Sequence, residues 1–252
     1  MSASHPGRRR RVVAVVQARV SSSRLPAKVL RDLGGRPVLG WVLRAALASS
    51  EVDAVLLATS VDPSDDAVVD LAGAYDGVAV HRGPLEDVLS RFTGGLAGDP
   101  AEAVVRLTAD CPLLDPALLD LLVRTWRASP GIDHLTTTNP RCLPRGLDVE
   151  VVSRRALEAV AATATGPDRA HVTSGVYRDP DRFEVAGLTL HPDGSDLRVT
   201  LDTPQDAALL DALVPLLGDG PPPWRSVVAA LRGRPDLVAL NADVQQKQWR
   251  EG

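Results

Sequence analysis

Long apolar runs and closely spaced cysteines are missing from the sequence, and each absence excludes a class of protein. No apolar stretch reaches the roughly 18 residues that a membrane span requires. The two cysteines, Cys111 and Cys142, do not have a metal-ligand spacing such as C-x-x-C, and in a cytosolic chain we do not expect a disulfide. We interpret both as small, half-buried apolar side chains.

Basic residues are also unevenly distributed. The segment 8–11 is basic, but only about seven apolar residues follow it, and they run into a charged loop without the small-residue cleavage site of a signal peptide. We therefore expect a cytoplasmic protein whose residues 1–11 are disordered. With a net charge of −4 and no other block rich in Lys or Arg, nothing indicates a nucleic-acid-binding surface.

Lysine is scarce: of 28 basic residues only two, Lys28 and Lys247, are lysines. Charges far from a ligand are screened within about 8 Å at physiological salt, so an anionic ligand would have to be held by a local cluster of cations. A lysine in a chain that otherwise uses arginine is therefore a candidate functional residue.

What the sequence does contain is a regular alternation of apolar, β-branched stretches with amphipathic ones. We expect strands at residues 12–18, 54–59, 78–81 and 103–108, and helices at 37–49, 63–74, 84–96 and 116–127. The strands are too uniformly apolar to face water, and each helix has a proline at or near its first turn. This alternation predicts an α/β fold, a doubly wound, mostly parallel, Rossmann-like sheet with helices on both faces.

The alternation loosens after residue 127. Further strands are expected at 132–137, 147–152, 183–190 and 197–201, and helices at 154–163, 169–178, 204–217 and 224–231. Residues 218–223 (GDGPPP) predict a rigid turn rather than a linker, because too little chain follows them to form another core. We expect a single domain over residues 12–252, with this half extending the sheet and adding an acceptor-binding or oligomer-forming flap.

The first strand runs into a polar, basic loop at residues 17–28 (QARVSSSRLPAK). A doubly wound sheet binds its ligand beyond the carboxyl ends of its strands, which is where this loop lies. Arg19, Arg24 and Lys28 are placed to converge on one anion, and each contact between a cation and a phosphate is worth about 4 kcal/mol before desolvation. Hydroxyl and backbone donors are added by Ser21, Ser22 and Ser23.

Neither a Walker A loop nor a G-x-G-x-x-G motif is present, so a P-loop NTPase and a dinucleotide dehydrogenase both lose support. The alternative for the 17–28 loop is a solvated segment whose charges pair with nearby carboxylates. Lys28 favours phosphate binding, because a compact ammonium suits a phosphate oxygen whose charge changes during a reaction.

Several motifs together resemble the cytidylyltransferases that activate sugar acids (CMP-KDO and CMP-sialate synthetases), and most closely their spore-coat polysaccharide (SpsF-like) branch. After the 17–28 loop they are LGGRPVL (33–39), HRGPLEDVL (81–89), RLTADCPLLD (106–115), PRGLDVE (144–150), HVT (171–173) and LRVTLDTPQD (197–206). The resemblance implies a fold of the nucleotide-diphospho-sugar transferase type, a nucleotide half at residues 12–127 and an acceptor or oligomer half at 128–252. It also implies CTP, Mg²⁺ and a homodimer.

Two aspartates complete the implied site. The resemblance makes Asp110 a Mg²⁺ ligand, and Asp202 is the carboxylate that would meet it across the site; each follows a predicted strand. Mg²⁺ usually takes one or two carboxylates together with substrate phosphates and water, so two aspartates are sufficient. The alternative for each is a helix N-cap, since each lies shortly before a proline and a predicted helix.

Further residues are assigned to the nucleotide side: Gln17, Ala18, Arg82, Gly83 and Arg106. A charge inside the fourth strand is rarely buried without a partner, and for the arginine at 106 that partner is either substrate or an internal acid such as the aspartate at 110.

Four residues are placed on the acceptor side: Arg145, Asp148, Glu150 and His171. Asp148 and Glu150 alternate on a predicted strand and so point the same way, which suits a second metal position, hydroxyl contacts to a sugar, or a solvated strand face. His171, on an amphipathic helix, also fits a purely structural role.

Two positions depart from the family pattern. Ala27 stands where the family has glycine and must be accommodated without the backbone freedom of glycine, which is harmless if its φ is negative. Ala170 stands where the family commonly has glutamate, which puts one contact to the usual acceptor in doubt.

These features predict an enzyme that transfers CMP from CTP to a small sugar-acid-like or phosphonate-like acceptor and releases pyrophosphate. In the expected in-line displacement an acceptor oxygen attacks the α-phosphate while Mg²⁺, Arg19, Arg24 and Lys28 stabilise charge. No signature of a covalent nucleophile is present. The alternatives are a glycosyltransferase, although Asp110-Cys-Pro supplies only one acid of an Asp-x-Asp motif, and a non-catalytic nucleotide-binding subunit.

Overall fold

The structure is a computed structural model that describes residues 9–246. Of the N-terminal residues expected to be disordered, 1–8 lie outside the described residues, as does Lys247. Arg10 and Arg11 are placed, and they pair with Glu102 and Asp99, respectively.

The described chain alternates strands and helices in the predicted order through its first half. The strands are β1 (Val12–Gln17), β2 (Ala54–Ser60), β3 (Val78–Gly83), β4 (Ala103–Thr108), β5 (His134–Thr136), β6 (Glu150–Ser153) and β7 (Val185–Gly187). The α-helices are α1 (Val38–Ala48), α2 (Asp66–Gly73), α3 (Val88–Gly95), α4 (Pro116–Ala128), α5 (Arg154–Ala161), α6 (Pro167–Ala170), α7 (Ser174–Tyr177), α8 (Pro204–Leu213), α9 (Trp224–Arg232) and α10 (Pro235–Val238). Short 3-10 helices are η1 (Lys28–Leu30), η2 (Pro63–Asp65) and η3 (Val214–Leu216).

The strands form one sheet in the order β3-β2-β1-β4-β6-β5-β7. β1 pairs in parallel with both β2 and β4, and β2 pairs in parallel with β3. β6 runs antiparallel to β4 and β5, while β5 and β7 are parallel. The predicted mostly parallel sheet is confirmed. Its strand order reverses between β1 and β4, and such a switch point is where open α/β sheets bind ligands.

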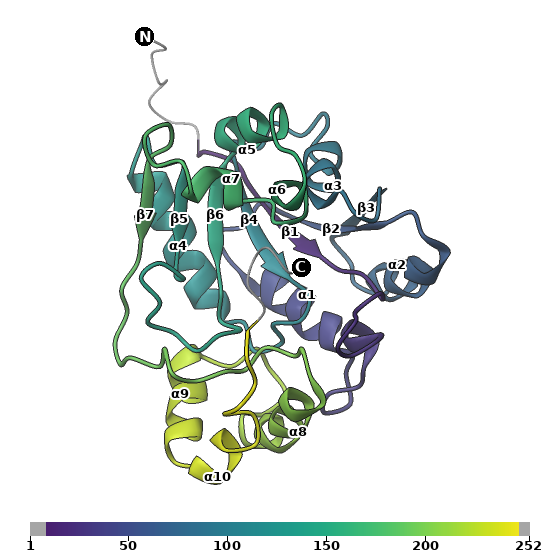
Figure 1. Cartoon of the computed structure of the whole chain (residues 1–252), viewed down its shortest axis with the longest axis vertical. Coiled ribbons are helices and arrows are strands. Elements are labelled where there is room, and N and C mark those ends of the chain that lie inside the picture. Colours follow the sequence, from purple (N-terminus) through teal and green to yellow (C-terminus); the bar gives the residue numbers. More distant parts are fainter. Residues whose placement is uncertain (1–8, 247–252) are drawn as a thin grey trace.

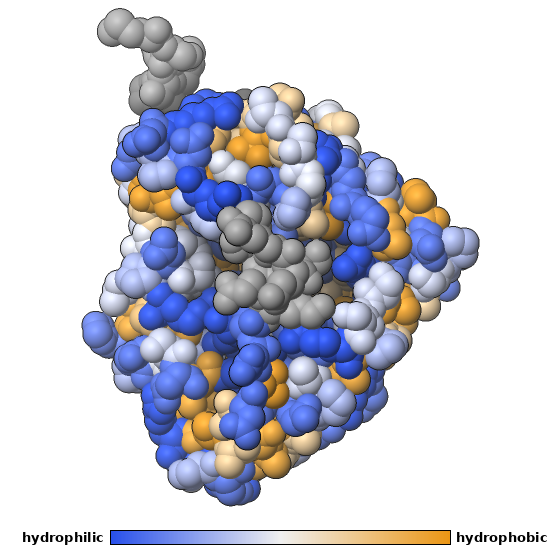
Figure 2. All heavy atoms as spheres, viewed as in Figure 1, coloured by the Kyte–Doolittle hydropathy of each residue, from blue (hydrophilic) through white to orange (hydrophobic). Residues whose placement is uncertain are grey.

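Helices cover both faces of the sheet (Figure 1). On one face α1 and α4 bury Trp41 and Trp126, and on the other α3 and α5 bury Phe92 and Leu157. Helices α8, α9 and α10 gather at one end of the molecule, and their apolar residues join the first of these cores. In Figure 2 the coloured surface is mainly hydrophilic, with apolar residues in small separate groups. Within the described residues, no helix is long and apolar enough to span a bilayer.

One strand prediction is wrong in the second half. Residues 197–201 are extended chain that pairs with loops: Val199 N donates to Arg145 O at 2.7 Å, and Leu201 N donates to Asp110 O at 2.8 Å. Gly146 allows this close approach, because a Cβ there would lie 2.5 Å from Thr200 N and its φ is 104°. The segment is thereby held against the loops that follow β4 rather than in the sheet.

Two further expectations need correction. The helix expected at 169–178 is broken between α6 and α7, and the intervening Thr173 donates its hydroxyl to Glu150 at 2.5 Å. β3 is not shielded from water as predicted, because it is the edge strand of the sheet, and Val80 is 38% exposed. The apolar composition of β3 alone did not reveal its edge position.

Candidate active site

A cleft of about 980 Å³ opens beyond the carboxyl ends of β1 and β4, at the switch point of the sheet. We call it the strand-end cleft. The predicted site residues that line it are Gln17, Ala18, Arg19, Ser21, Ser22, Ser23, Arg24, Lys28, Arg106, Asp110, Arg145, Asp148, Glu150, His171 and Asp202. Segments that are up to 185 residues apart in sequence (17 to 202) thus meet around one cavity.

The loop after β1 is closed by backbone contacts. Ala27 N donates to Val20 O at 3.0 Å, and Val20 N donates to Asp65 Oδ1 at 2.6 Å. Asp65, fully buried, also accepts from Ser60 N at 3.2 Å and so fixes the loop against the end of β2. Ala27 adopts φ 54°, in the left-handed region that favours glycine. The condition of a negative φ is therefore not met, and the alanine carries backbone strain.

Lys28 lies at the centre of the cleft between two carboxylates. Its Nζ is 2.5 Å from Asp110 Oδ2 and 2.7 Å from Asp202 Oδ1, and only 11% of its side chain is exposed. Burial acts to lower the pKa of Lys28, but the two carboxylates more than offset it and the pKa is raised. The three groups converge, so the cleft contains one cation held by two acids.

Two arginines flank the same pair of acids. Arg24 Nη2 lies 2.9 Å from Asp202 Oδ2, and so does Arg198 Nη2. Burial acts to raise the pKa of Asp202, but Lys28 first and then Arg24 and Arg198 lower it, so the net shift is downward. Asp202 is therefore an ionised carboxylate surrounded by three cations.

The alternative role of these aspartates as helix caps is excluded by the geometry. The N-cap of α4 is Asp115, whose side chain accepts from Ala117 N, and not Asp110. The N-cap of α8 is Thr203, which forms a capping box with Asp206. Neither Asp110 nor Asp202 is therefore the N-cap of a helix.

The carboxylate oxygens of Asp110 and Asp202 are ligands that suit a hard cation such as Mg²⁺. The described residues contain no group of three or more His, Cys, Asp and Glu side chains that could enclose a metal ion. Mg²⁺ does not need such a cage, since it takes one or two carboxylates and completes its shell with phosphates and water. Two carboxylates that already share one cation, Lys28, fit that pattern.

At the other end of the cleft, Arg106 pairs with Glu150 rather than with Asp110. Arg106 Nη1 is 2.6 Å from Glu150 Oε1, and Arg106 Nε donates to Gln17 Oε1 at 3.1 Å. The second oxygen of Glu150 contacts His134 Nε2 at 3.1 Å. Burial acts to raise the pKa of Glu150, but the Arg106 charge leads the contacts that offset it, and the pKa is held far below its usual range. Both oxygens of this carboxylate are therefore already engaged.

The remaining residues predicted for the acceptor side, Asp148, Arg145 and His171, differ in their ion pairs and positions. Asp148 lies before β6 rather than on it, and its Oδ1 is 2.6 Å from Arg141 Nη1. Within the described part of the chain, the Arg145 side chain makes no ion pair. Burial, followed by the charge of Arg141, lowers the pKa of Arg145. Arg145 and His171 both line the cleft.

Two predicted nucleotide-binding residues are not brought to the cleft: Arg82 and Gly83. Arg82 Nη1 is 2.6 Å from Asp66 Oδ1, and Arg82 Nε donates to Ser60 O at 2.8 Å. Neither residue is part of the cleft lining. The prediction placed Arg82 at the ligand, whereas its guanidinium turns toward Asp66 of α2.

The comparisons with known proteins now decide the family. A family model for cytidylyltransferases matches residues 13–169, more than half of the chain. The chain belongs to the cytidylyltransferase family. It is 30% identical over 237 residues to the spore coat polysaccharide biosynthesis protein SpsF of Bacillus subtilis, covering 90% of this chain and 96% of that one. It is 32% identical over 246 residues to an uncharacterized protein of Methanocaldococcus jannaschii, with 96% and 98% covered.

Solved structures agree with this assignment. A cytidylyltransferase from Leptospira borgpetersenii superposes with a TM-score of 0.87 at 26% identity, over 95% of this chain and 100% of that one. The CMP-2-keto-3-deoxy-manno-octonic acid synthetase complexed with CTP has a TM-score of 0.63 at 18% identity, over 81% and 98%, and so shares the fold. The protein is thus an enzyme, a nucleotidyltransferase, and its predicted family is confirmed.

Two buried arginines of this cytidylyltransferase were not predicted from the sequence. Arg198 is 9% exposed and bridges Asp202 and Asp206. Arg91 is 2% exposed and lines the strand-end cleft. Arg91 lies in a helix with a regular amphipathic pattern, and such a pattern predicts that an arginine is on the solvent-exposed face. Arg198 lies in the LRVTLDTPQD motif, but nothing in that motif showed that it is buried.

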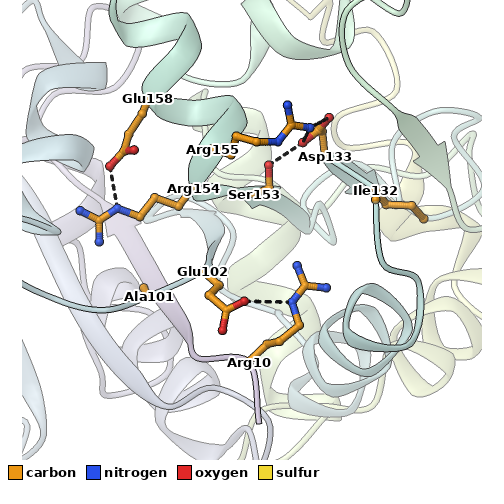
Figure 3. A pocket seen from close by; sticks show the side chains of 10 residues that line it. Arg10, Ala101, Glu102, Ile132, Asp133, Ser153, Arg154, Arg155 and Glu158 are labelled. Carbon is orange, nitrogen blue, oxygen red and sulfur yellow. Dashed lines mark hydrogen bonds and ion pairs between the residues drawn. The ribbon is translucent and has the colours of Figure 1, made fainter. Parts of the chain in front are cut away.

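A second cavity, of about 490 Å³, lies at the opposite end of the central strands, where β4 and β5 begin and β6 ends. Figure 3 shows its charged side chains paired with one another. Arg10 meets Glu102 at 3.3 Å, and Arg154 meets Glu158 at 2.7 Å. Arg155 likewise pairs with a buried aspartate, at 2.5 Å. Each of these arginines has an acid, whereas Arg145 of the strand-end cleft makes no ion pair among the described residues, so the strand-end cleft is the better candidate for an anionic substrate.

Proposed function

We propose that this cytidylyltransferase transfers CMP from CTP to a small acceptor that carries an acidic group, such as a sugar acid or a phosphonate, with release of pyrophosphate and with Mg²⁺ as cofactor. The observation that supports it best is the convergence of Lys28, Asp110 and Asp202 at the switch point of the sheet. The names of its relatives, SpsF and several 3-deoxy-manno-octulosonate cytidylyltransferases, point to polysaccharide biosynthesis.

In this proposal the loop after β1 binds the phosphates of CTP. Arg19, Arg24 and Lys28 line the cleft on one loop, with the serines at 21–23 between them. Cations and backbone donors that are already in place stabilise the charge on a leaving pyrophosphate without reorganisation during the reaction. Asp110 and Asp202 would hold Mg²⁺, which supplies neutralisation of phosphate charge when bound.

In this proposal the acceptor binds at the part of the cleft that Arg145 lines. Arg145 lines the cleft and makes no ion pair with any residue that the structure describes, which suits a carboxylate or phosphonate of the acceptor. Glu150 has both oxygens occupied, so it holds Arg106 in place rather than removing a proton from the acceptor. An acceptor bound there lies beside the central phosphate site, as an in-line attack on the α-phosphate requires.

The test is a matrix of nucleotides and acceptors. The protein is incubated with Mg²⁺, each of CTP, UTP, ATP and GTP, and a panel of sugar acids and phosphonates, and pyrophosphate is measured. We expect pyrophosphate only with CTP and a matching acceptor. A parallel incubation replaces the nucleotide with a preformed nucleotide sugar, whose consumption would indicate a glycosyltransferase. Nucleotide binding without any product would indicate a non-catalytic subunit. The homodimer and the cytoplasmic location stay predictions; sedimentation velocity tests the first and cell fractionation the second.

A further inference from the structure

The most unusual charge outside the cluster at Lys28 is the guanidinium of Arg91. Its Nε and Nη1 are buried, and neither has a hydrogen-bond partner among residues 9–246. Arginine keeps its charge at neutral pH, and a buried donor without a partner costs free energy on the order of 1–3 kcal/mol, or more for a charged group. Yet Arg91 lines the strand-end cleft, so the missing partner has a place from which to come.

Three acids act on the charge of Arg91: Asp65, Asp87 and Glu86. Glu86 is exposed, and its Oε1 lies 4.0 Å from Arg19 Nη1. Asp65 accepts from Val20 N and from Ser60 N, and Asp87 caps α3 and pairs with Arg169 at 2.6 Å. Burial lowers the pKa of Arg91, and the charge of Arg19 lowers it further, so the folded protein disfavours this cation. These contacts leave the guanidinium available to a ligand with acceptor atoms.

The position of Arg91 indicates which part of a nucleotide it meets. Arg91 is on α3, and its Cγ lies 2.9 Å from where a Cβ of Gly83 would be, so it packs at the end of β3. The strand order puts β3 on one side of β1 and β4, and β6 on the other. Arg91 therefore lines the cleft on the β3 side. Arg145 lines it next to Asp202, because its backbone pairs with that of Arg198, and Arg198 contacts Asp202, which contacts Lys28.

The α-phosphate of a nucleotide carries the nucleoside, the leaving pyrophosphate and the attacking acceptor. With the phosphates at Lys28 and the acceptor at Arg145, the nucleoside is directed toward Arg91. We propose that Arg91 hydrogen-bonds the base of the bound nucleotide and selects cytosine over uracil. This inference rests on the proposed function, because it takes the central site to hold the phosphates.

The chemistry of the two bases supports this role. Cytosine presents N3 and the O2 carbonyl as adjacent acceptors, which a guanidinium matches with two parallel N–H donors. Uracil has an N–H donor at position 3, which would face the cation with the wrong polarity. A site built to donate hydrogen bonds discriminates strongly against a ligand that cannot accept them.

The experiment compares wild type with Arg91→Met, a variant of similar length without donors. CTP and UTP are each titrated into the protein with Mg²⁺ by calorimetry, with Arg124→Met, an exposed arginine on α4, as the matched control. We expect the preference of wild type for CTP over UTP to fall about 10- to 100-fold in Arg91→Met and to be unchanged in the control.

The same variants separate a base contact from a structural role. Because Arg91 has no partner for two of its nitrogens, Arg91→Met should melt at the same temperature as ligand-free wild type or higher. Retained preference for CTP in the variant, or an equal loss of CTP and UTP binding, would overturn the inference. A wild-type protein without preference for CTP would instead refute the proposed function itself.

Discussion

Replacing Lys28 with methionine tests the central cluster most sharply, because it removes one cation from between two acids. The substitution deletes contacts of 2.5 Å to Asp110 and 2.7 Å to Asp202 while keeping an unbranched side chain. Loss of a phosphate-binding donor of this kind lowers turnover by about 100- to 1000-fold. The same change removes the cation that Asp110 and Asp202 share, so the pair should attract a metal ion more strongly, while Asp202 keeps Arg24 and Arg198.

The stability change can be worked out from the contacts. Asp202 keeps Arg24 and Arg198 as partners, so the loss is that of charged hydrogen bonds, about 2 kcal/mol, rather than of a whole buried pair. For a chain of this size each kcal/mol shifts the melting temperature by about 2–4 °C, so Lys28→Met should melt about 4–8 °C lower.

Turnover, melting temperature and metal binding should therefore all change in Lys28→Met. Pyrophosphate release should fall, the melting temperature should drop slightly, and Mn²⁺ binding in the absence of nucleotide, measured by electron paramagnetic resonance, should tighten. Arg31→Met, which removes an exposed surface pair with Asp211, should change none of the three strongly. Pyrophosphate release at the wild-type rate by a folded Lys28→Met would refute the assigned role of Lys28.

Further substitutions test other parts of the account. Ala27→Gly should relieve the strain at φ 54° and stabilise the protein by about 0.5–1 kcal/mol, seen as a higher melting temperature; a lower one would contradict the left-handed backbone there. Because the pKa of Glu150 is lowered on folding, its stabilisation is present above its unfolded pKa of about 4.3 and is lost as the pH falls below it. Glu150→Gln should therefore lower the free energy of unfolding at pH 7 and flatten its decline in acid, which urea titrations between pH 3 and 7 would show. Arg145→Met should raise the KM for an acidic acceptor about 10- to 100-fold while the KM for CTP stays within a few-fold of wild type; equal effects on both would remove Arg145 from the acceptor site.

Much of the fold follows from patterns that act locally. Residues 103–108 are a run of β-branched and apolar residues around one arginine, and β4 spans the same residues. Residues 37–49 have an apolar repeat after a proline, and α1 covers Val38–Ala48. The extended segment 197–201 has an equally apolar pattern, but it pairs with loops. Which partner an extended segment finds is a long-range property that composition does not contain.

The candidate site was predictable to the extent that its residues lie at the ends of buried strands. Lys28 and Asp110 were placed near each other because they follow β1 and β4, parallel strands that end at the same side of the sheet. Asp202 follows the extended segment 197–201, which is not a strand, and its expected place in the site rested on the resemblance. Arg82 was misplaced because the sequence does not show that its guanidinium turns toward Asp66 of α2. Arg91 was missed because helix periodicity marks an arginine as surface, whereas its burial depends on α3 packing at the end of β3.

The most direct test of the account is a mass measurement of the acceptor after incubation of the protein with CTP, Mg²⁺ and sugar-acid or phosphonate acceptors. We predict that one acceptor gains the mass of a cytidylyl group in step with pyrophosphate release, and that Lys28→Met abolishes both. Pyrophosphate release without a cytidylyl mass on any acceptor, or equal cytidylyl transfer by Lys28→Met, would contradict this prediction.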